Sequence, residues 1–330
     1  MMANNANMTV EPVEAKLESP ISIRMKLMWR AFKENWKIFS QSKIGMIGLY
    51  IVVIFAVAGF IVYPILANTV WKTTSLNAMV SYNPVTGYDF LQNNPAPPSW
   101  AHLLGTDPLG RDVLAQLLYS TPREFMLGIV AALITVIIGT LIGTVAAYFG
   151  GTLDTFFMRL ADIVLLFPFI PFLIVISGMM QVDLLTLALI IGLLSGFGGI
   201  TIVLRSQGLI IKSRPFIESA KVSGASDAYI IVNHIIPNVM PLSFLYMMFN
   251  VTGAIFSEAV LSFFGLLNIK MSWGLMIYTA DTAGYIIGSN IWNYWWLWLP
   301  SGASITLLCG AFYFIGRGLD EVVNPRLRKR

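Results

Sequence analysis

Long apolar segments, separated by shorter polar ones, make up most of the chain after residue 43. Six of them are long enough to cross the roughly 30 Å hydrocarbon core of a bilayer as a helix. Backbone groups inside lipid must find hydrogen-bonding partners within their own segment, which favours helices over single strands. The pattern therefore predicts an all-α membrane protein with six transmembrane helices, at residues 44–66, 125–149, 160–180, 184–204, 239–261 and 295–315.

Composition supports this prediction. Hydrophobic residues make up 56% of the 330-residue chain and charged residues only 12%, whereas about a quarter of the residues in a soluble protein are charged. One water-soluble core cannot bury so much apolar surface, so lipid must cover much of it. The net charge of +4 does not indicate a nucleic-acid partner.

The basic residues predict the orientation, because cytoplasmic loops are enriched in lysine and arginine. With the N-terminus in the cytoplasm, 17 of the 21 basic residues lie inside, and only Lys72, Arg111, Arg123 and Lys270 lie outside. We therefore expect a multi-pass protein of the cell (inner or plasma) membrane with both termini cytoplasmic.

This orientation divides the chain into segments. We predict a cytoplasmic N-terminal segment at residues 1–43, the first span at 44–66 and an extracellular loop at 67–120. A membrane core at 121–317 follows, which contains a cytoplasmic loop at 205–237, and a basic cytoplasmic tail at 318–330 ends the chain.

Two of these segments carry local signals. In the first, Met25, Trp29, Phe32 and Trp36 recur at helical spacing among basic residues, which predicts an amphipathic helix on the inner membrane surface. The extracellular loop is rich in proline and is expected to be largely irregular. A short helix is expected near its end, with Thr106 or Asp107 as the N-cap.

Candidate chemistry is sparse. The single cysteine, Cys309, lies in an apolar run and is interpreted as a packing residue, while His102 and His234 fit no metal-binding spacing. The sequence therefore predicts no catalytic residue and no metal site.

A few acids and bases lie near span ends. Arg159 and Asp162 are three residues apart and are predicted to form a structural ion pair, with Asp154 nearby. Glu258 lies about 30 Å along the fifth span, so we expect it at the outer interface rather than at a buried, proton-coupling position.

The polar insert "ESAKVSGASDAYIIVNHIIPN", residues 218–238, predicts a helix, a tight turn and a second helix. Gly224 can adopt backbone angles closed to other residues and so end the first helix. Ser226 or Asp227 can cap the second helix, which is expected to run to about Ile236, where Pro237 marks entry to the fifth span.

The spacing of this insert resembles the signature loop of ABC importer permeases, which reads EAA, three residues, G, about ten residues, I-x-P. Here Glu-Ser-Ala precedes Gly224 and Ile-Ile-Pro ends the pattern, with Ser219 in place of the usual alanine. In that family the loop docks on the ATP-hydrolysing subunit. The resemblance assigns this coupling role to Glu218, Ser219, Ala220, Gly224, Ala225, Ser226, Asp227, Ile235 and Pro237.

Other stretches, such as "LLGTDPLGRDVLAQLLYSTP" (103–122) and "EAVLSFFGLLNIKMSWGLMI" (258–277), resemble the C-type permease of the dipeptide, oligopeptide and nickel group. The resemblance covers nearly everything after residue 20, and residues 67–98 match least. It implies the type I ABC importer permease fold. It also implies a B-type permease partner in a heterodimer, two ATP-binding subunits and an extracellular substrate-binding protein.

A GxxxxGK[ST] phosphate loop is absent from the chain, which contains no Gly-Lys pair. We therefore expect a transport subunit that is not an enzyme and binds no cofactor, with ATP and magnesium on its partners. Peptides are the first expectation for the cargo, with oligosaccharides or nickel as alternatives. The third hypothesis is a secondary transporter or channel with no ATP-hydrolysing subunit. Such proteins form ion sites at broken helices, and Gly196, Gly198 and Gly199 could break the fourth span.

Overall fold

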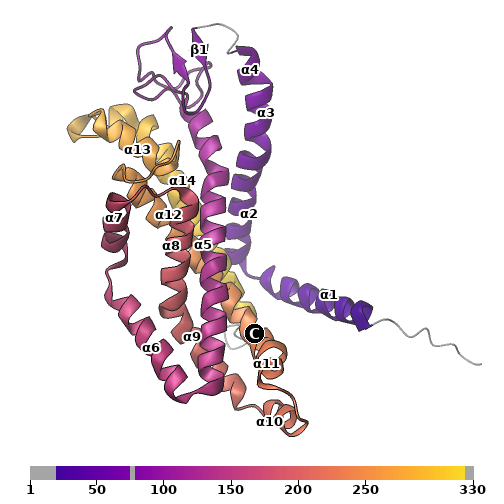
Figure 1. Cartoon of the computed structure of the whole chain (residues 1–330). Helices are drawn as coiled ribbons and strands as arrows, with labels where there is room; N and C mark the ends of the chain where they lie inside the picture. The colour runs from indigo at the N-terminus through magenta and orange to yellow at the C-terminus, as the bar shows by residue number, and fades with distance from the viewer. Residues whose placement is uncertain (1–19, 75–78, 324–330) are drawn as a thin grey trace, which may run out of the picture.

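The computed structural model describes residues 20–74 and 79–323. Helices dominate the described chain (Figure 1). In order, the elements are α1 (Pro20–Phe39), α2 (Lys43–Val57), the π-helical turn η1 (Ala58–Val62), α3 (Tyr63–Asn68), α4 (Val70–Thr74), β1 (Val80–Ser81), β2 (Tyr88–Asp89), α5 (Val113–Phe149), α6 (Gly151–Leu166), α7 (Phe169–Met179), α8 (Leu184–Phe197), α9 (Gly199–Lys212), α10 (Pro215–Val222), α11 (Asp227–Ile230), the π-helical turn η2 (Ile231–Ile235), α12 (Ile236–Phe263), α13 (Trp273–Thr282), the 3₁₀ helix η3 (Gly288–Tyr294) and α14 (Trp295–Val323).

Within the described residues, four continuous helical segments are long and apolar enough to span a membrane: Lys43–Lys72, Val113–Phe149, Asp227–Phe263 and Ile291–Val323. Two further spans are bent pairs, α6 with α7 at 79° and α8 with α9 at 42°. Counting each pair as one span gives the six that the sequence predicts.

The spans predicted at residues 160–180 and 184–204 are the two bent ones, and the sequence did not predict the bend in the first. In the first, Pro168 forces Phe167 into an extended conformation and α6 stops. In the second, the helix breaks at Gly198, whose φ of −86° and ψ of −133° are not helical. Gly198 is one of the three glycines that the sequence indicated could break the fourth span.

The longest helix, α5, is the centre of the bundle and packs against α8, α9 and α12 (Figure 1). Small residues on α5 make this close approach possible. A side chain at Gly128 would collide with Val251 of α12, and one at Gly143 would collide with the backbone of Thr201 and Arg205 in α9.

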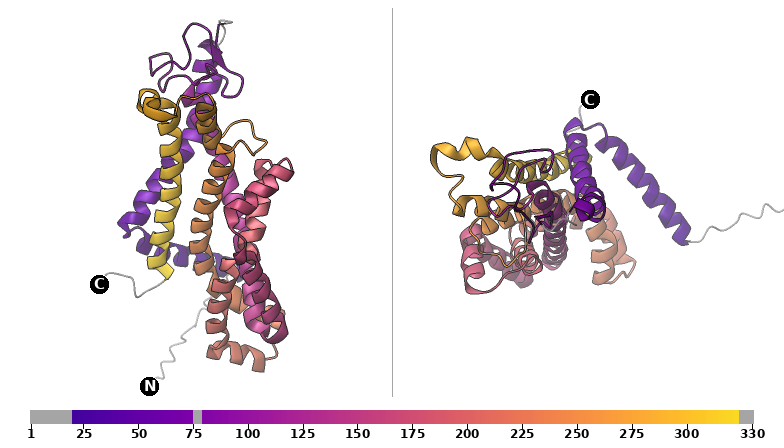
Figure 2. Two further views of the ribbon diagram at one scale, coloured as in Figure 1. Left: turned by 90° about the vertical axis from the view of Figure 1, so that its left-hand side faces the viewer. Right: turned by 90° about the horizontal axis from the view of Figure 1, so that it is seen from above.

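The bundle has two distinct ends (Figures 1 and 2). At the hairpin end lie α4, the β1–β2 pair and α13. At the loop end lie α10 and α11, and the α1 helix leaves the bundle in the same half. In the antiparallel hairpin Val80 pairs with Asp89 and Ser81 with Tyr88.

The predicted amphipathic helix is present as α1, and its contact with the bundle is made near its C-terminal end, where Phe39 is buried against Gly45 and Gly318. Trp29, Phe32 and Trp36 stack in a row and are exposed. Its position on a membrane surface remains an expectation.

The predicted cap at Thr106 or Asp107 was wrong. Helix α5 begins at Val113, and Asp112 caps it by accepting the amide of Ala115 at 2.6 Å. Asp107 instead accepts the backbone amides of Leu109 and Arg111 and the Arg111 guanidinium, which shapes a turn before the helix. The predicted second span, 125–149, therefore begins twelve residues earlier, and the predicted boundary of the preceding loop at 120 lies inside α5.

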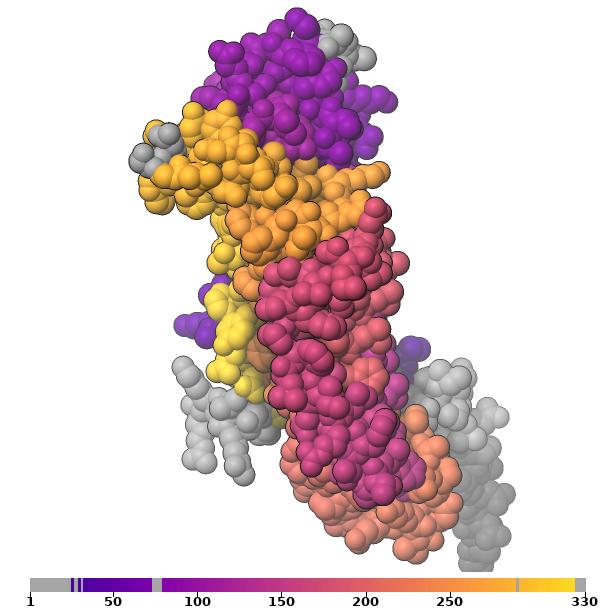
Figure 3. Space-filling model, turned by 60° about the vertical axis from the view of Figure 1, so that its left-hand side comes forward, coloured from indigo at the N-terminus to yellow at the C-terminus, as the bar shows by residue number. Residues whose placement is uncertain are grey.

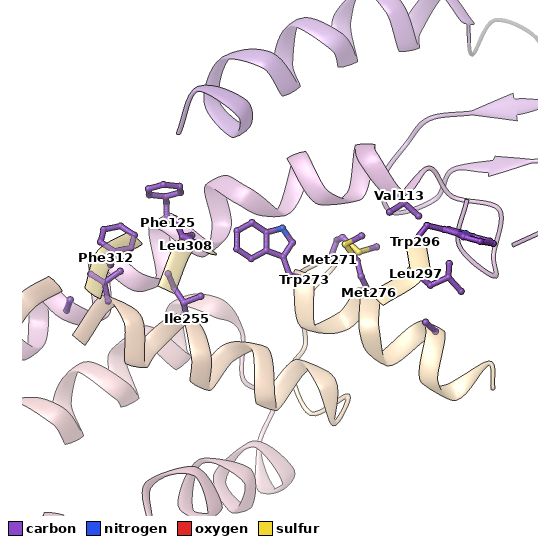
Figure 4. Close-up of a cluster of buried hydrophobic side chains, with 13 residues drawn as sticks. Val113, Phe125, Ile255, Met271, Trp273, Met276, Trp296, Leu297, Leu308 and Phe312 are labelled. Atoms are coloured by element: carbon purple, nitrogen blue, oxygen red, sulfur yellow. The ribbon is translucent and has the colours of Figure 1, made fainter. Parts of the chain in front are cut away.

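A cluster of buried side chains from α5, α12, α13 and α14 forms the core toward the hairpin end (Figure 4). It includes Phe125, Ile255, Trp273, Leu308 and Phe312. Cys309 packs against this cluster, as its interpretation as a packing residue predicts.

Candidate functional site: the helical loop at one end of the bundle

The segment between α9 and α12 folds as the predicted helix, tight turn and helix, and it forms the tip of the loop end (Figure 3). Pro215 stands in the first turn of α10, where its missing amide hydrogen costs nothing. Gly224 has a φ of +80°. The amide of Gly224 donates to Lys221 O and that of Ala225 to Ala220 O, which satisfies the last carbonyls of α10 in a Schellman motif.

Of the two predicted caps for the second helix, Ser226 holds the position. Its Oγ accepts the amide of Tyr229 at 3.3 Å. The predicted end of this helix near Ile236 was wrong, since α11 continues through η2 into α12 without interruption. Pro237 cannot donate to the turn before it, and the helix accommodates this with the wider π-helical turn at Ile231–Ile235.

Apolar anchors fasten the loop to the bundle. Ile217, Ile230 and Ile235 are buried in one cluster with Leu204 of α9 and Val239 of α12. The buried face explains why this polar insert holds a fixed shape although it lies at the tip of the molecule.

A polar contact joins the same loop to the central helix. The hydroxyl of Tyr148, at the end of α5, donates to Oδ1 of Asp227 at 2.5 Å. The ammonium groups of Lys221 and Lys212 lie 5.1 and 5.9 Å from the centre of the Tyr148 ring, close enough for a cation–π interaction. Sequence reasoning missed Tyr148, because no local signal links the end of an apolar span to a residue beyond the next two spans.

The remaining predicted residues divide by exposure. Glu218, Ser219, Gly224, Ser226, Asp227 and Pro237 are exposed, Ala220 and Ala225 are half-buried, and Ile235 is buried. The structure thus places Ile235 as an anchor, whereas the exposed positions are open to a partner.

Large apolar side chains also face outward on this loop. Val222, the last residue of α10, is 91% exposed, and Phe216, Tyr229 and Val232 are exposed as well. The rings of Phe216 and Tyr229 both lie near His234, at 6.2 and 5.7 Å. We call Phe216, Val222, Tyr229 and Val232 the apolar rim.

The predicted ion pair between Arg159 and Asp162 is present at 3.4 Å, but the side chains are 78% and 52% exposed. Such a pair contributes little to stability. The more enclosed pair joins Asp154 of α6 to Arg205 of α9 in a two-pronged contact, with Nη2 and Oδ2 2.5 Å apart. Sequence reasoning noted Asp154 but did not find its partner.

The expectation that Glu258 is not buried was wrong, although it lies five residues before the end of α12. Its side chain is fully buried, because its face of α12 is turned toward α5 and α13 rather than toward the surface of the bundle.

A second polar network lies at the hairpin end. His102 is buried between Asp112, 2.7 Å from Nδ1, and Asp89, 3.1 Å from Nε2. Burial lowers the pKa of His102, but the hydrogen bonds and negative charges of the two aspartates outweigh this and raise the pKa above its ordinary value. Within residues 20–74 and 79–323, no three His, Cys, Asp or Glu side chains are placed to hold a metal ion.

A groove lies where both bent spans break. Phe167, Gly198, Tyr246 and Asn250 line it, so the two breaks and α12 share one recess. Its walls are mainly apolar, with the Asn250 amide donating to Tyr246 O.

A bundle of apolar helices long enough to span a bilayer is the architecture of a multi-pass membrane protein. Residues 139–329 match the family described as binding-protein-dependent transport system inner membrane component, and the chain belongs to this family. The architecture is the type I importer permease fold.

Curated relatives extend the similarity over the whole chain. The chain is 31% identical over 300 residues to the dipeptide transport system permease protein DppC of Bacillus subtilis (strain 168), covering 90% of this chain and 86% of the relative. It is 31% identical over 322 residues to the oligopeptide transport system permease protein OppC of Haemophilus influenzae, covering 97% and 95%. The chain is 28% identical over 331 residues to the oligopeptide transport system permease protein OppC of Bacillus subtilis (strain 168), covering 99% of this chain and 100% of the relative.

Proposed function

We propose that this chain is the membrane-spanning permease subunit of an ATP-driven importer of di- or oligopeptides. It forms half of the translocation pathway, and residues 215–237 bind the ATP-binding subunits and couple their conformational change to that of the permease. Its partners are a second, B-type permease subunit, two ATP-binding subunits and an extracellular substrate-binding protein. The chain has no ATPase site of its own, so ATP and magnesium bind to the ATP-binding subunits. Peptides are the proposed cargo because the relatives that match most of the chain are dipeptide and oligopeptide permeases by name.

The observation that carries the coupling role is the contrast between the two sides of the loop. One side is fixed to the bundle by Ile217, Ile230 and Ile235 and by the bond from Tyr148 to Asp227. The other side leaves Val222 almost fully exposed at the tip. A surface that is rigidly backed and apolar fits a groove on a soluble partner, which receives the short helix α10.

The same proposal sets the orientation. The loop end faces the cytoplasm, where ATP-binding subunits reside, and the hairpin end faces the substrate-binding protein outside. Both chain termini are then cytoplasmic, in agreement with the positive-inside count.

The groove at the two helix breaks supplies the pathway surface in this proposal. Tyr246 and Asn250 offer polar groups in an otherwise apolar recess, at the level where α6–α7 and α8–α9 bend. The switch between inward-open and outward-open states follows from the different interactions of the ATP-binding subunits with the two arrangements of the loops.

Val222→Glu tests the docking role, because a charge at the tip of α10 would be desolvated in an apolar groove. The variant is expected to lose copurification of the ATP-binding subunits and uptake of a labelled tripeptide in proteoliposomes. Leu103→Glu places the same charge on an exposed leucine at the hairpin end and is expected to keep copurification intact. Unchanged copurification and uptake in Val222→Glu would contradict the proposal.

Mass spectrometry of the ligand retained by the binding protein tests the cargo separately.

A further inference from the structure

Two glutamates meet inside the bundle, in the half that contains the hairpin end. Glu124 belongs to α5 and is 1% exposed, and Glu258 belongs to α12 and is 0% exposed. Each carboxyl group lies close enough to affect the ionisation of the other. The neighbours Phe125, Ile255 and Trp273 belong to the core cluster drawn in Figure 4, so the pair lies in apolar surroundings.

Most of the oxygens in this pair lack a hydrogen-bonding partner. Oε1 of Glu258 accepts from the Ser262 hydroxyl at 2.5 Å. Among the residues that the structure describes, Oε2 of Glu258 and both oxygens of Glu124 have no hydrogen-bonding partner. Buried carboxylate oxygens without donors are costly and rare, so a proton or another cation is needed between the two carboxyl groups.

The described surroundings offer no basic side chain to neutralise the pair. The adjacent Arg123 is engaged elsewhere, since its guanidinium donates to Tyr119 O at 2.7 Å and lies 3.5 Å from the centre of the Tyr119 ring. From α14 the titratable group near Glu124 is the Cys309 thiol. The Trp273 amide at the start of α13 lies near Glu124, and the hydroxyl of Ser272, the N-cap of α13, lies near Glu258, but neither makes a hydrogen bond to the three unpartnered oxygens.

The Ser262 hydroxyl and the dipole of α13 can support one negative charge but not two. Helix α13 has ten residues and begins at Trp273 beside Glu124, so the positive end of its dipole faces the pair. Two ionised carboxylates in contact and out of water repel each other strongly, and pairs of this kind retain one proton between them.

We propose that Glu124 and Glu258 form a proton-binding site that holds one proton and carries one negative charge. Protonated Glu124 donates its O–H to Oε2 of Glu258, while Ser262 donates to Oε1. The shared proton supplies a donor to an oxygen that otherwise has none and joins α5 to α12 next to the start of α13. Loss of the proton leaves two negative charges in a dry contact and separates these helices.

The site makes folding depend on pH. The folded chain binds a proton that the unfolded chain releases at neutral pH, so folding takes up a proton here. Stability is therefore greatest at low pH and falls as the pH rises through the titration of the pair. Because the site lies in the half with the hairpin end, the same titration is expected to loosen the contact of α13 with the bundle.

Infrared spectroscopy of the full chain in nanodiscs tests the proposal directly, because a protonated carboxyl has a carbonyl stretch distinct from that of a carboxylate. The wild type is expected to show a buried protonated carboxyl at neutral pH that persists into alkaline buffer. Glu124→Gln is expected to lose this band and still fold, since its amide can donate to Glu258 Oε2. Asp162→Asn, which removes an exposed carboxylate, is the matched control and should keep the band.

Thermal unfolding as a function of pH provides the second readout. The melting temperature of the wild type and of Asp162→Asn is expected to fall on alkaline titration, and Glu124→Gln is expected to show a smaller fall, which retains the contribution of His102. A wild type without a protonated carboxyl band at neutral pH would overturn the proposal even if no variant folded. So would a tightly held sodium, potassium or calcium ion in the purified wild type that is absent from Glu124→Gln, since a metal cation would then occupy the pair.

Discussion

The hydroxyl of Tyr148 lies 2.5 Å from Oδ1 of Asp227, so the last turn of α5 is bonded to the first residue of α11. Helix α5 is also the helix against which α8, α9 and α12 pack. The loop is therefore connected to the central helix by one hydrogen bond and by the buried side chains of Ile217, Ile230 and Ile235.

Tyr148→Phe removes this hydrogen bond and keeps the ring that packs with the loop. We expect a loss of about 1 kcal/mol in local stability, since Asp227 remains accessible to water. Assembly with the ATP-binding subunits should persist, while the number of peptides imported per ATP hydrolysed falls. Parallel measurement of uptake and ATP hydrolysis in proteoliposomes checks this. Tyr229→Phe, at an exposed ring of the same loop, is the control, and equal coupling in both variants would contradict the role of Tyr148.

Gly224 is a conformational requirement rather than a packing one. A side chain at this position would meet nothing within 4 Å, but the φ of +80° is unfavourable for residues with a Cβ. Gly224→Ala is therefore expected to destabilise the turn by about 1–2 kcal/mol. Gly224→Asn should cost less, because asparagine tolerates the left-handed conformation.

Protease cleavage within residues 213–227 measures this effect, with faster cleavage expected in the alanine variant than in the asparagine variant. Gly302→Ala, in a helix and equally free of nearby atoms, is the control and should be cleaved like the wild type. The reverse order for alanine and asparagine would show that the turn does not depend on backbone conformation.

The two ion pairs near the loop end should differ in energy. Asp154→Asn breaks a two-pronged, partly enclosed contact between α6 and α9 and is expected to cost about 1.5–3 kcal/mol. Asp162→Asn breaks an exposed contact within α6 and should cost less than about 0.5 kcal/mol. Thermal unfolding in detergent compares them, and similar losses in both variants would mean that the Asp154–Arg205 pair is no stronger than a surface pair.

The sequence was most informative where structure is set locally. Composition and segment length predicted the spans, and a glycine followed by a serine cap predicted the turn between α10 and α11. Contacts between distant residues were not predictable in this way. Tyr148 and Asp227 are 79 positions apart, and Asp154 and Arg205 are 51 apart.

Glu258 illustrates the same limit for burial. Its distance along the fifth span could be computed from the helical rise. Whether its face of α12 meets lipid or Glu124 depends on how two helices rotate against each other, which is decided by packing at Gly128, Val251 and Ile255.

The hairpin end should respond to pH through His102. The raised pKa comes from Asp112 and Asp89 outweighing burial, so the folded segment binds the proton more tightly than the unfolded one. This contribution to stability is fully present below the unfolded pKa of about 6.5 and is lost as the pH rises through the higher folded value. Asp112 also caps α5. Loss of the proton from His102 therefore weakens its contact with Asp112 and is expected to loosen both the loop around His102 and the start of α5. Protection factors for amide exchange of residues 79–118, corrected for the base-catalysed intrinsic rate, should fall over this alkaline-going range in the wild type. His102→Gln should lose that pH dependence, and His234→Gln should retain it; an identical pH response in His102→Gln would assign the effect to another group.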